Sequence, residues 1–175
     1  MKKFLLGVAR LKIAGTFIGF IFTYFPFIIP LKKLFITKNF VAVAHPSPSY
    51  PGHALIIPRK IARTVFDLTA EDFIGAIETA KKIRRDDHSF IIIINGGKRQ
   101  DVMQAHFHLV TGDFIENINS KSKTIEFGTA PELFYSERFA SGFRGLLHSG
   151  GVSDESFSFC IQFDNASDRG TAYAL

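Results

Sequence analysis

The sequence predicts an α+β fold: an antiparallel sheet with one long covering helix and an added apolar helix at the N-terminus. Three observations predict it. Several short apolar runs are bounded by Pro, Gly or Asn, one stretch has the period of an amphipathic helix, and a late run alternates apolar with polar residues. We expect three parts, at residues 1–33, 34–112 and 113–175, the last adding one further strand packed on the middle part.

The N-terminal part contains an uncharged stretch at residues 13–31, with basic residues on both sides. Pro26 and Pro30 predict that its helix ends near Phe25, which leaves a short apolar helical run. Three interpretations stay open: a helix lying on a membrane, a helix spanning it, and a helix packed on its own domain or on a second copy. A signal peptide is disfavoured because Arg10 and Lys12 interrupt the apolar stretch.

The charge of the chain is unevenly distributed. Residues 1–66 contain ten basic side chains and no acidic one, whereas the whole chain has a formal net charge of +5. This asymmetry favours an anionic ligand, or an anionic membrane surface bound through residues 1–33 on the inner face of the membrane. No nucleic-acid motif accompanies it, so no nucleic-acid partner is expected. The single cysteine, Cys160, fits a reducing cytoplasmic compartment. A second copy of the chain, in a homodimer, is a further possible partner.

Three short strands are expected in the first half of the middle part. Residues 34–36 and 40–44 form two of them around a turn at residues 37–39, and residues 53–57 form the third, which Pro58 ends. A helix follows, beginning at Thr69, which serves as its N-cap with Asp72 three residues later, and running to about residue 85.

The second half of the sheet is predicted from three further runs. Residues 90–94 are continuously apolar, as in a strand buried on both faces, and residues 95–97 (Asn-Gly-Gly) form a turn that can approach a ligand closely. Residues 102–110 and 156–163 alternate, as half-buried strands do.

The strand at residues 102–110 carries the candidate chemistry. Gln104, His106 and His108 fall on one face of it. Three interpretations stay open: solvated histidines, a divalent metal site completed by His53 or His45, and phosphorus chemistry with histidine as nucleophile or proton carrier.

The wider sequence resembles the histidine-triad (HIT) family. The stretch from Gln100 to Gly112 resembles the family's signature, in which a glutamine precedes three alternating histidines by four residues. His53 and the apolar strand ending in Ile57-Pro58-Arg59-Lys60 resemble the family's entry strand, and Asn95 matches its phosphate-side asparagine. The resemblance covers residues 34–112 and implies a nucleotide or related phospho-ligand as substrate, with no cofactor and no metal.

The resemblance also implies roles for individual residues. His106 would attack the α-phosphorus as nucleophile and carry a covalent nucleotidyl group, and His108 would contact phosphoryl oxygens. Asn95 and Gln100 would bind the phosphate or the leaving group, and His53 would frame the nucleoside side. The implied activity is that of a phosphoramidate or phosphoanhydride hydrolase or a nucleotidyl transferase; the alternative is a binding module without turnover.

Three positions depart from the family pattern. Gln104 stands where the first histidine belongs, and His45 stands where many members have an aspartate that binds ribose. Asp101 follows Gln100 at a position that usually has a small hydroxyl residue, so Lys98 and Arg99 would have to offset its charge. A rival register would make His106 and His108 the first and second histidines, with Val110 in place of the third.

Overall fold

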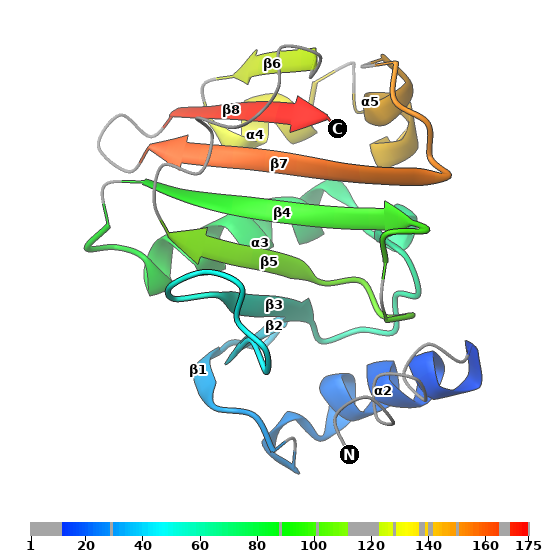
Figure 1. Cartoon of the computed structure of the whole chain (residues 1–175), viewed down its shortest axis with the longest axis vertical. Helices are drawn as coiled ribbons and strands as arrows, with labels where there is room; N and C mark the ends of the chain where they lie inside the picture. The colour runs from blue at the N-terminus through cyan, green and yellow to red at the C-terminus, as the bar shows by residue number, and fades with distance from the viewer. Residues whose placement is uncertain are drawn as a thin grey trace.

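One eight-stranded sheet, in the order β1-β2-β3-β5-β4-β7-β8-β6, organises the molecule in the computed structural model (Figure 1). Neighbouring strands pair antiparallel throughout the described part of the chain. The α+β prediction is therefore confirmed. The structure describes residues 12–28, 30–87, 89–100, 102–111, 123–127, 129–136, 139, 142–149, 151–164 and 169–174.

The strands of the middle part follow the expected order. Their bounds are β1 Lys33–Ile36, β2 Phe40–Ala44, β3 Ala54–Pro58, β4 Ser89–Gly97 and β5 Phe107–Thr111. The turn between β1 and β2 closes because the N–H of Phe40 donates to Oγ1 of Thr37 at 2.8 Å. Pro58 ends β3, and the N–H of the next residue, Arg59, donates to the carbonyl oxygen of Asn39.

Helices cover one face of this sheet. α3 (Ala70–Ile83) is the long covering helix, and η2 (Val65–Asp67), α4 (Ala130–Phe134) and α5 (Gly142–Ser149) lie on the same side. α3 begins as the sequence predicts, because the carboxylate of Asp72 accepts from the N–H of Thr69 at 2.7 Å. The main core lies between these helices and the strands, with Phe73 stacked on both Phe134 and Phe143.

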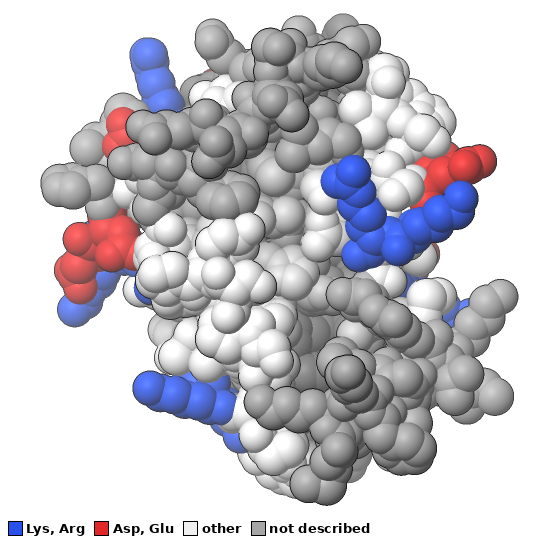
Figure 2. Space-filling model, in the orientation of Figure 1, with Lys and Arg blue, Asp and Glu red and all other residues white. Residues whose placement is uncertain are grey.

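On the opposite face of the sheet, the described residues form two small apolar clusters. One contains Val41, Val43 and Ile57 from β2 and β3, and the other contains Ile91, Val110 and Cys160 from β4, β5 and β7. His53 and His108 have the same alternation as these residues, so they lie on this less covered face. In this view the charged side chains of the described residues lie mostly around the edge of the molecule (Figure 2).

The C-terminal part extends the sheet further than the sequence predicts. It adds β6 (Lys123–Phe127), β7 (Ser156–Asp164) and β8 (Arg169–Ala174), where only one strand was expected. β7 pairs with β4 along its whole length, from Ser89↔Asp164 to Gly97↔Ser156. β4 is therefore a central strand, which explains its continuous apolar run.

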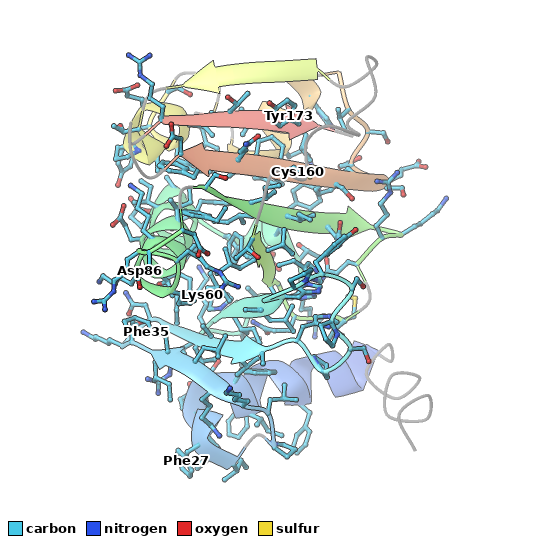
Figure 3. The ribbon with its side chains drawn as sticks, turned by 60° about the vertical axis from the view of Figure 1, so that its left-hand side comes forward. Phe27, Phe35, Lys60, Asp86, Cys160 and Tyr173 are labelled. Atoms are coloured by element: carbon cyan, nitrogen blue, oxygen red, sulfur yellow. The ribbon has the colours of Figure 1, made fainter. Side chains whose placement is uncertain are left out.

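The N-terminal helix α2 (Lys12–Tyr24) lies at one end of the molecule and is followed by a single 3-10 turn, η1 (Pro26–Ile28) (Figure 1). Its end at Tyr24 agrees with the prediction from Pro26. Phe22 packs beside Val41, Val43 and Ile57, whereas Phe27 lies at the lower tip of the molecule (Figure 3). None of the helices in the described ranges is long and apolar enough to cross a bilayer.

Two predicted boundaries are wrong. Residues 95–97 are not a turn: they continue β4 and pair with residues 156–158 of β7, because the partner strand lies in the C-terminal part. Residues 102–106 are not part of a strand, since β5 begins at Phe107. In that segment the N–H of Ala105 donates to the carbonyl oxygen of Ala62 at 2.7 Å, so the backbone bonds to a loop and not to a neighbouring strand.

Candidate active site

His106 lies just before β5 and is half-buried. Its Nδ1 is 2.8 Å from the backbone carbonyl oxygen of Gln104. A carbonyl oxygen can only accept, so Nδ1 carries the proton in the neutral ring and Nε2 holds the lone pair. This tautomer gives the imidazole a nucleophilic nitrogen at Nε2.

His108 of β5 and His53, the residue just before β3, form a hydrogen-bonded pair. Nε2 of His53 is 3.0 Å from Nδ1 of His108, and the N–H of Ser49 donates to Nδ1 of His53 at 3.3 Å. Because Nδ1 of His53 accepts, its proton is on Nε2 and is donated to His108. His108 then carries its own proton on Nε2, which makes it a hydrogen-bond donor next to His106, at a ring-centroid distance of 5.0 Å.

His45, His53 and His108 form a cluster that is electrically neutral at pH 7. Burial lowers the pKa of His108 to about 3, helped by the other three histidines, and lowers the pKa of His53 to about 4, helped by His45. Burial also lowers the pKa of His45, whose ring stacks on His53 at 4.0 Å. These three rings therefore provide hydrogen-bond donors and do not provide positive charge.

The same cluster was the candidate metal site. Nitrogen atoms of His45, His53 and His108 lie within 4.8 Å of one another. A metal-bound histidine normally donates its second ring nitrogen to an acceptor. Here Nδ1 of His45 and Nδ1 of His53 both accept from backbone N–H groups, of Ser47 and Ser49, so the protons occupy the nitrogens that would face the metal. The geometry favours a hydrogen-bonded network over a metal centre.

Asn95 is held by the C-terminal part of the chain. Its Oδ1 accepts from the hydroxyl of Ser158 at 2.7 Å, and Arg99 donates to the same hydroxyl oxygen at 3.0 Å. Continuing the β4–β5 register from Ile93↔His108 by two residues brings Asn95 opposite His106. Since Oδ1 is used, the NH2 group of Asn95 is the part that can donate to a ligand. Ser158 was not predicted from the sequence, because its only signal is a polar position in the alternating run at residues 156–163.

The two glutamines of the signature are both bonded to backbone groups. Nε2 of Gln100 donates to the carbonyl oxygens of Arg63 and Val102, at 2.6 and 2.8 Å, which uses both of its N–H groups. Nε2 of Gln104 donates to the carbonyl oxygen of Lys60 at 3.0 Å. The side chains of Lys98 and Arg99 are exposed at the end of β4. Asp101, whose charge was expected to oppose a phosphate, lies outside the described residues.

A cavity of about 140 Å³ opens beside His106. Its lining is mostly apolar and comes from α2, β3 and the segment before β5: Phe22, Leu55, Ile57, Val102, Gln104 and His106. An apolar cavity of about 150 Å³ can hold a single benzene ring, so this one has room for a ring but not for a whole nucleotide. Phe22 was not predicted to be part of the site, because its position in an apolar helix gives no specific signal.

The chain is similar to known proteins in both sequence and fold. The sequence model of the HIT domain matches residues 28–115, half of the chain. The chain belongs to the HIT family. An uncharacterized HIT-like protein of Chlamydia muridarum (strain MoPn / Nigg) is 32% identical over 98 residues, which are 51% of this HIT protein and 78% of the relative.

Two further similarities extend the comparison. The adenosine 5'-monophosphoramidase of Saccharomyces cerevisiae is 34% identical over 86 residues, covering 47% of this HIT protein and 54% of the relative. The crystal structure of a yeast Ap4A phosphorylase in complex with AMP superposes with a TM-score of 0.53 at 11% identity, over 79% of this chain and 56% of that one. This last similarity concerns the fold alone, and it reaches beyond the residues that the HIT model matches.

Proposed function

We propose that this HIT protein is a nucleotidyl hydrolase or transferase that acts through a covalent phospho-histidine on His106. The observation that carries the proposal is the bond from Nδ1 of His106 to the carbonyl oxygen of Gln104, since it leaves the lone pair on Nε2. By analogy with the monophosphoramidase of Saccharomyces cerevisiae, the substrate is a nucleotide with an amine or another leaving group on its α-phosphate.

The reaction has two steps. Nε2 of His106 forms a bond to phosphorus while the bond from phosphorus to the leaving group breaks; the leaving group departs with the electron pair and takes a proton from water. Water or another acceptor then attacks phosphorus and releases its proton to solvent, the phosphorus–nitrogen bond breaks, and Nε2 regains its lone pair. Hydrolase and transferase activities differ only in this acceptor.

The neighbouring groups support charge development on the phosphoryl oxygens. His108 offers its Nε2–H, and Asn95 offers its NH2 group, which Ser158 orients. Because His53 and His108 are neutral, the cations that attract the anionic substrate are those at the end of β4, Lys98 and Arg99. His45 stacks on His53 where an aspartate would bind ribose, so it would contact the sugar through its ring.

The test is direct labelling. The full chain is incubated with an adenosine 5'-phosphoramidate that carries a radioactive phosphorus, quenched in alkali, and mapped for phospho-histidine. We expect label on His106 that is lost in His106→Ala and retained in His148→Ala, a matched change of an exposed histidine on α5. Turnover without label on any histidine would contradict the covalent mechanism.

The second candidate function is a nucleotide-binding module without turnover. It is favoured by one observation: the N–H groups of Gln100 and the side chain of Gln104 are bonded to backbone groups, so fewer side chains can meet a transition state. Binding of AMP, measured by calorimetry, without label or turnover would support this candidate over the enzyme.

We also propose that the protein attaches to anionic membranes of the cytoplasmic face through α2 and η1. Six apolar side chains of this segment are 42–66% exposed: Phe17, Phe20, Tyr24, Phe25, Phe27 and Ile28. Phe27 is the one labelled in Figure 3. Lys32 and Lys38 are exposed nearby in the chain, and no acidic residue occurs before Asp67. An apolar face with basic flanks fits the interface of an anionic bilayer.

Flotation with liposomes tests this attachment. The full chain should float with vesicles that contain phosphatidylglycerol and much less with pure phosphatidylcholine. Changing Phe17, Phe27 and Ile28 to Ser together should abolish flotation, whereas Tyr135→Ser, which removes a similarly exposed aromatic residue (62%) from another part of the surface, should not. Equal flotation of both variants would refute the attachment. Dimerisation that only the triple variant loses would instead assign this face to a second copy.

A further inference from the structure

The wall of the cavity beside His106 is partly made by α2. Phe22 contributes to the cavity lining and also packs beside Val41, Val43 and Ile57 on the sheet. The helix is held at its C-terminal end by Arg59, whose guanidinium donates to the carbonyl oxygen of Thr23 at 3.3 Å and of Thr37 at 3.1 Å. The position of α2 therefore sets one boundary of the space next to the nucleophile.

Gln104, another residue of the cavity wall, lies against α2 at Gly19. Its side chain is almost fully buried, at 2% exposure. Nε2 donates to the carbonyl oxygen of Lys60 at 3.0 Å, and Oε1 accepts from the N–H of Ala62 at 3.4 Å. The amide is thus fixed from both sides by the loop after β3, and its orientation follows from these two bonds.

Gly19 lies directly against this fixed amide. A Cβ atom at position 19 would be 2.3 Å from Oε1 and 3.3 Å from Cδ of Gln104, closer than carbon and oxygen atoms can approach. Phe22 follows three residues later and therefore lies on the same side of the helix. Glycine weakens the interior of a helix, so this glycine is accounted for by the contact with Gln104.

We propose that Gln104 is a positioning residue: its side chain forms the seat for Gly19, and so holds Phe22 as the wall of the cavity beside His106. The histidine that the family pattern has at this position is thereby replaced by a group that orients α2. The role of the cavity in substrate binding rests on the proposed nucleotidyl activity, whereas the seating of α2 on Gln104 does not.

The contact with Gln104 reverses the effect that Gly19→Ala would otherwise have on the stability of α2. In a helix that does not touch Gln104, Gly19→Ala should strengthen α2, because alanine is the better helix former. With the contact, Gly19→Ala should push α2 away from its seat. Gln104→Ala also loosens α2, but it creates room for a methyl group, so adding Gly19→Ala to Gln104→Ala should restore order to the helix.

Hydrogen exchange in the full chain measures the seating without any substrate. We expect backbone amides at residues 19–24 to exchange faster in Gly19→Ala and in Gln104→Ala, and more slowly in the double variant than in Gln104→Ala. Slower exchange in Gly19→Ala with Gln104 present would overturn the proposal. This readout decides the seating even if the protein has no turnover.

Kinetics with adenosine 5'-phosphoramidate measure the consequence for the cavity. Gly19→Ala should raise KM about tenfold, the size of effect expected when an apolar wall is displaced, while kcat changes less than KM. Gln104→Asn keeps an amide on a shorter side chain. It should therefore lose the bonds to Lys60 and Ala62, and its KM should be higher than that of the unchanged chain. A fall of kcat alone, with KM unchanged, would assign Gln104 to the chemistry and contradict the positioning role.

Discussion

His53 donates its Nε2–H to Nδ1 of His108 across 3.0 Å, and this bond fixes the proton of a histidine that stands next to the candidate nucleophile. Ser49 sets the direction of this bond, because its N–H donates to Nδ1 of His53 and so leaves the proton of His53 on Nε2. A loop amide thus determines which nitrogen of His108 can donate to a ligand. This chain of hydrogen bonds from Ser49 through His53 to His108 requires both rings to be neutral, and burial keeps them neutral.

The first prediction concerns His53→Ala. Without its donor, Nδ1 of His108 is free to take the proton, and the ring then presents an acceptor to the phosphoryl group. We expect kcat/KM for adenosine 5'-phosphoramidate to fall roughly 10- to 100-fold, as when other partners that orient a histidine are removed. His53→Gln, whose amide can donate to Nδ1, should recover part of the loss. Nitrogen chemical shifts of His108 would report the tautomer, and an unchanged tautomer in His53→Ala would contradict this chain of hydrogen bonds.

The second prediction concerns the dependence of stability on pH. The folded protein holds His108 and His53 at pKa values of about 3 and about 4, below their ordinary value of 6.5. Between pH 6.5 and these lowered pKa values the unfolded chain binds more protons than the folded chain, so protons favour unfolding. The contribution of the neutral histidines to the free energy of unfolding is fully present above pH 6.5. It is lost progressively as the pH falls toward 3. The melting temperature should therefore decrease steadily below pH 6.5.

Matched variants separate this effect from general acid denaturation. His108→Gln should make the decrease between pH 6.5 and pH 4.5 shallower, because it removes a group whose pKa differs between the two states. His148→Gln, at an exposed position on α5, should leave the slope as it is. Identical slopes in both variants would show that the buried histidines do not contribute.

The sequence predicted the fold class and most elements because their signals are local. Pro26 ended α2, Thr69 and Asp72 began α3, and alternation identified β7. What could not be predicted depends on partners distant in the sequence. A turn was predicted at residues 95–97, but these residues extend β4 because β7 lies beside them. Tertiary pairing decided this case over local propensity.

The candidate site shows the same division. The alternation of Gln104, His106 and His108 was predicted from the sequence, although the strand itself begins only at Phe107. The bonding of each side chain was not, because it depends on loop amides: Ser49 for His53, and Ala62 for Gln104. Phe22 and Ser158 enter the site from the two ends of the chain, outside the stretch that carries the family pattern.

The third prediction concerns Ser158→Ala. Its hydroxyl donates to Oδ1 of Asn95, and Arg99 donates to the hydroxyl, so the change removes the group that orients the asparagine. We expect kcat/KM to fall about fivefold, the equivalent of about 1 kcal/mol for one hydrogen bond. Ser158→Thr keeps the hydroxyl and should restore activity. Ser156→Ala, two residues earlier at the exposed start of β7, is the control and should have no effect.

The last prediction concerns Gly96 and Phe157, which pair across β4 and β7. A Cβ atom at position 96 would lie 2.1 Å from the ring of Phe157, and this ring is fully buried beside Phe66 and Phe143. Gly96→Ala should therefore lower the free energy of unfolding by about 1–3 kcal/mol, as overpacking of a core does. Urea denaturation measures the loss.

A double variant identifies the cause of that loss. Phe157→Leu is destabilising by itself because it leaves space in the core, and this space lies where the methyl group of Gly96→Ala would go. Gly96→Ala should thus cost less in the Phe157→Leu background than in the original chain. If the two losses simply added, the ring would not be the obstacle. The glycine would then be required for another reason, such as the close approach of a ligand that the Asn-Gly-Gly sequence first predicted.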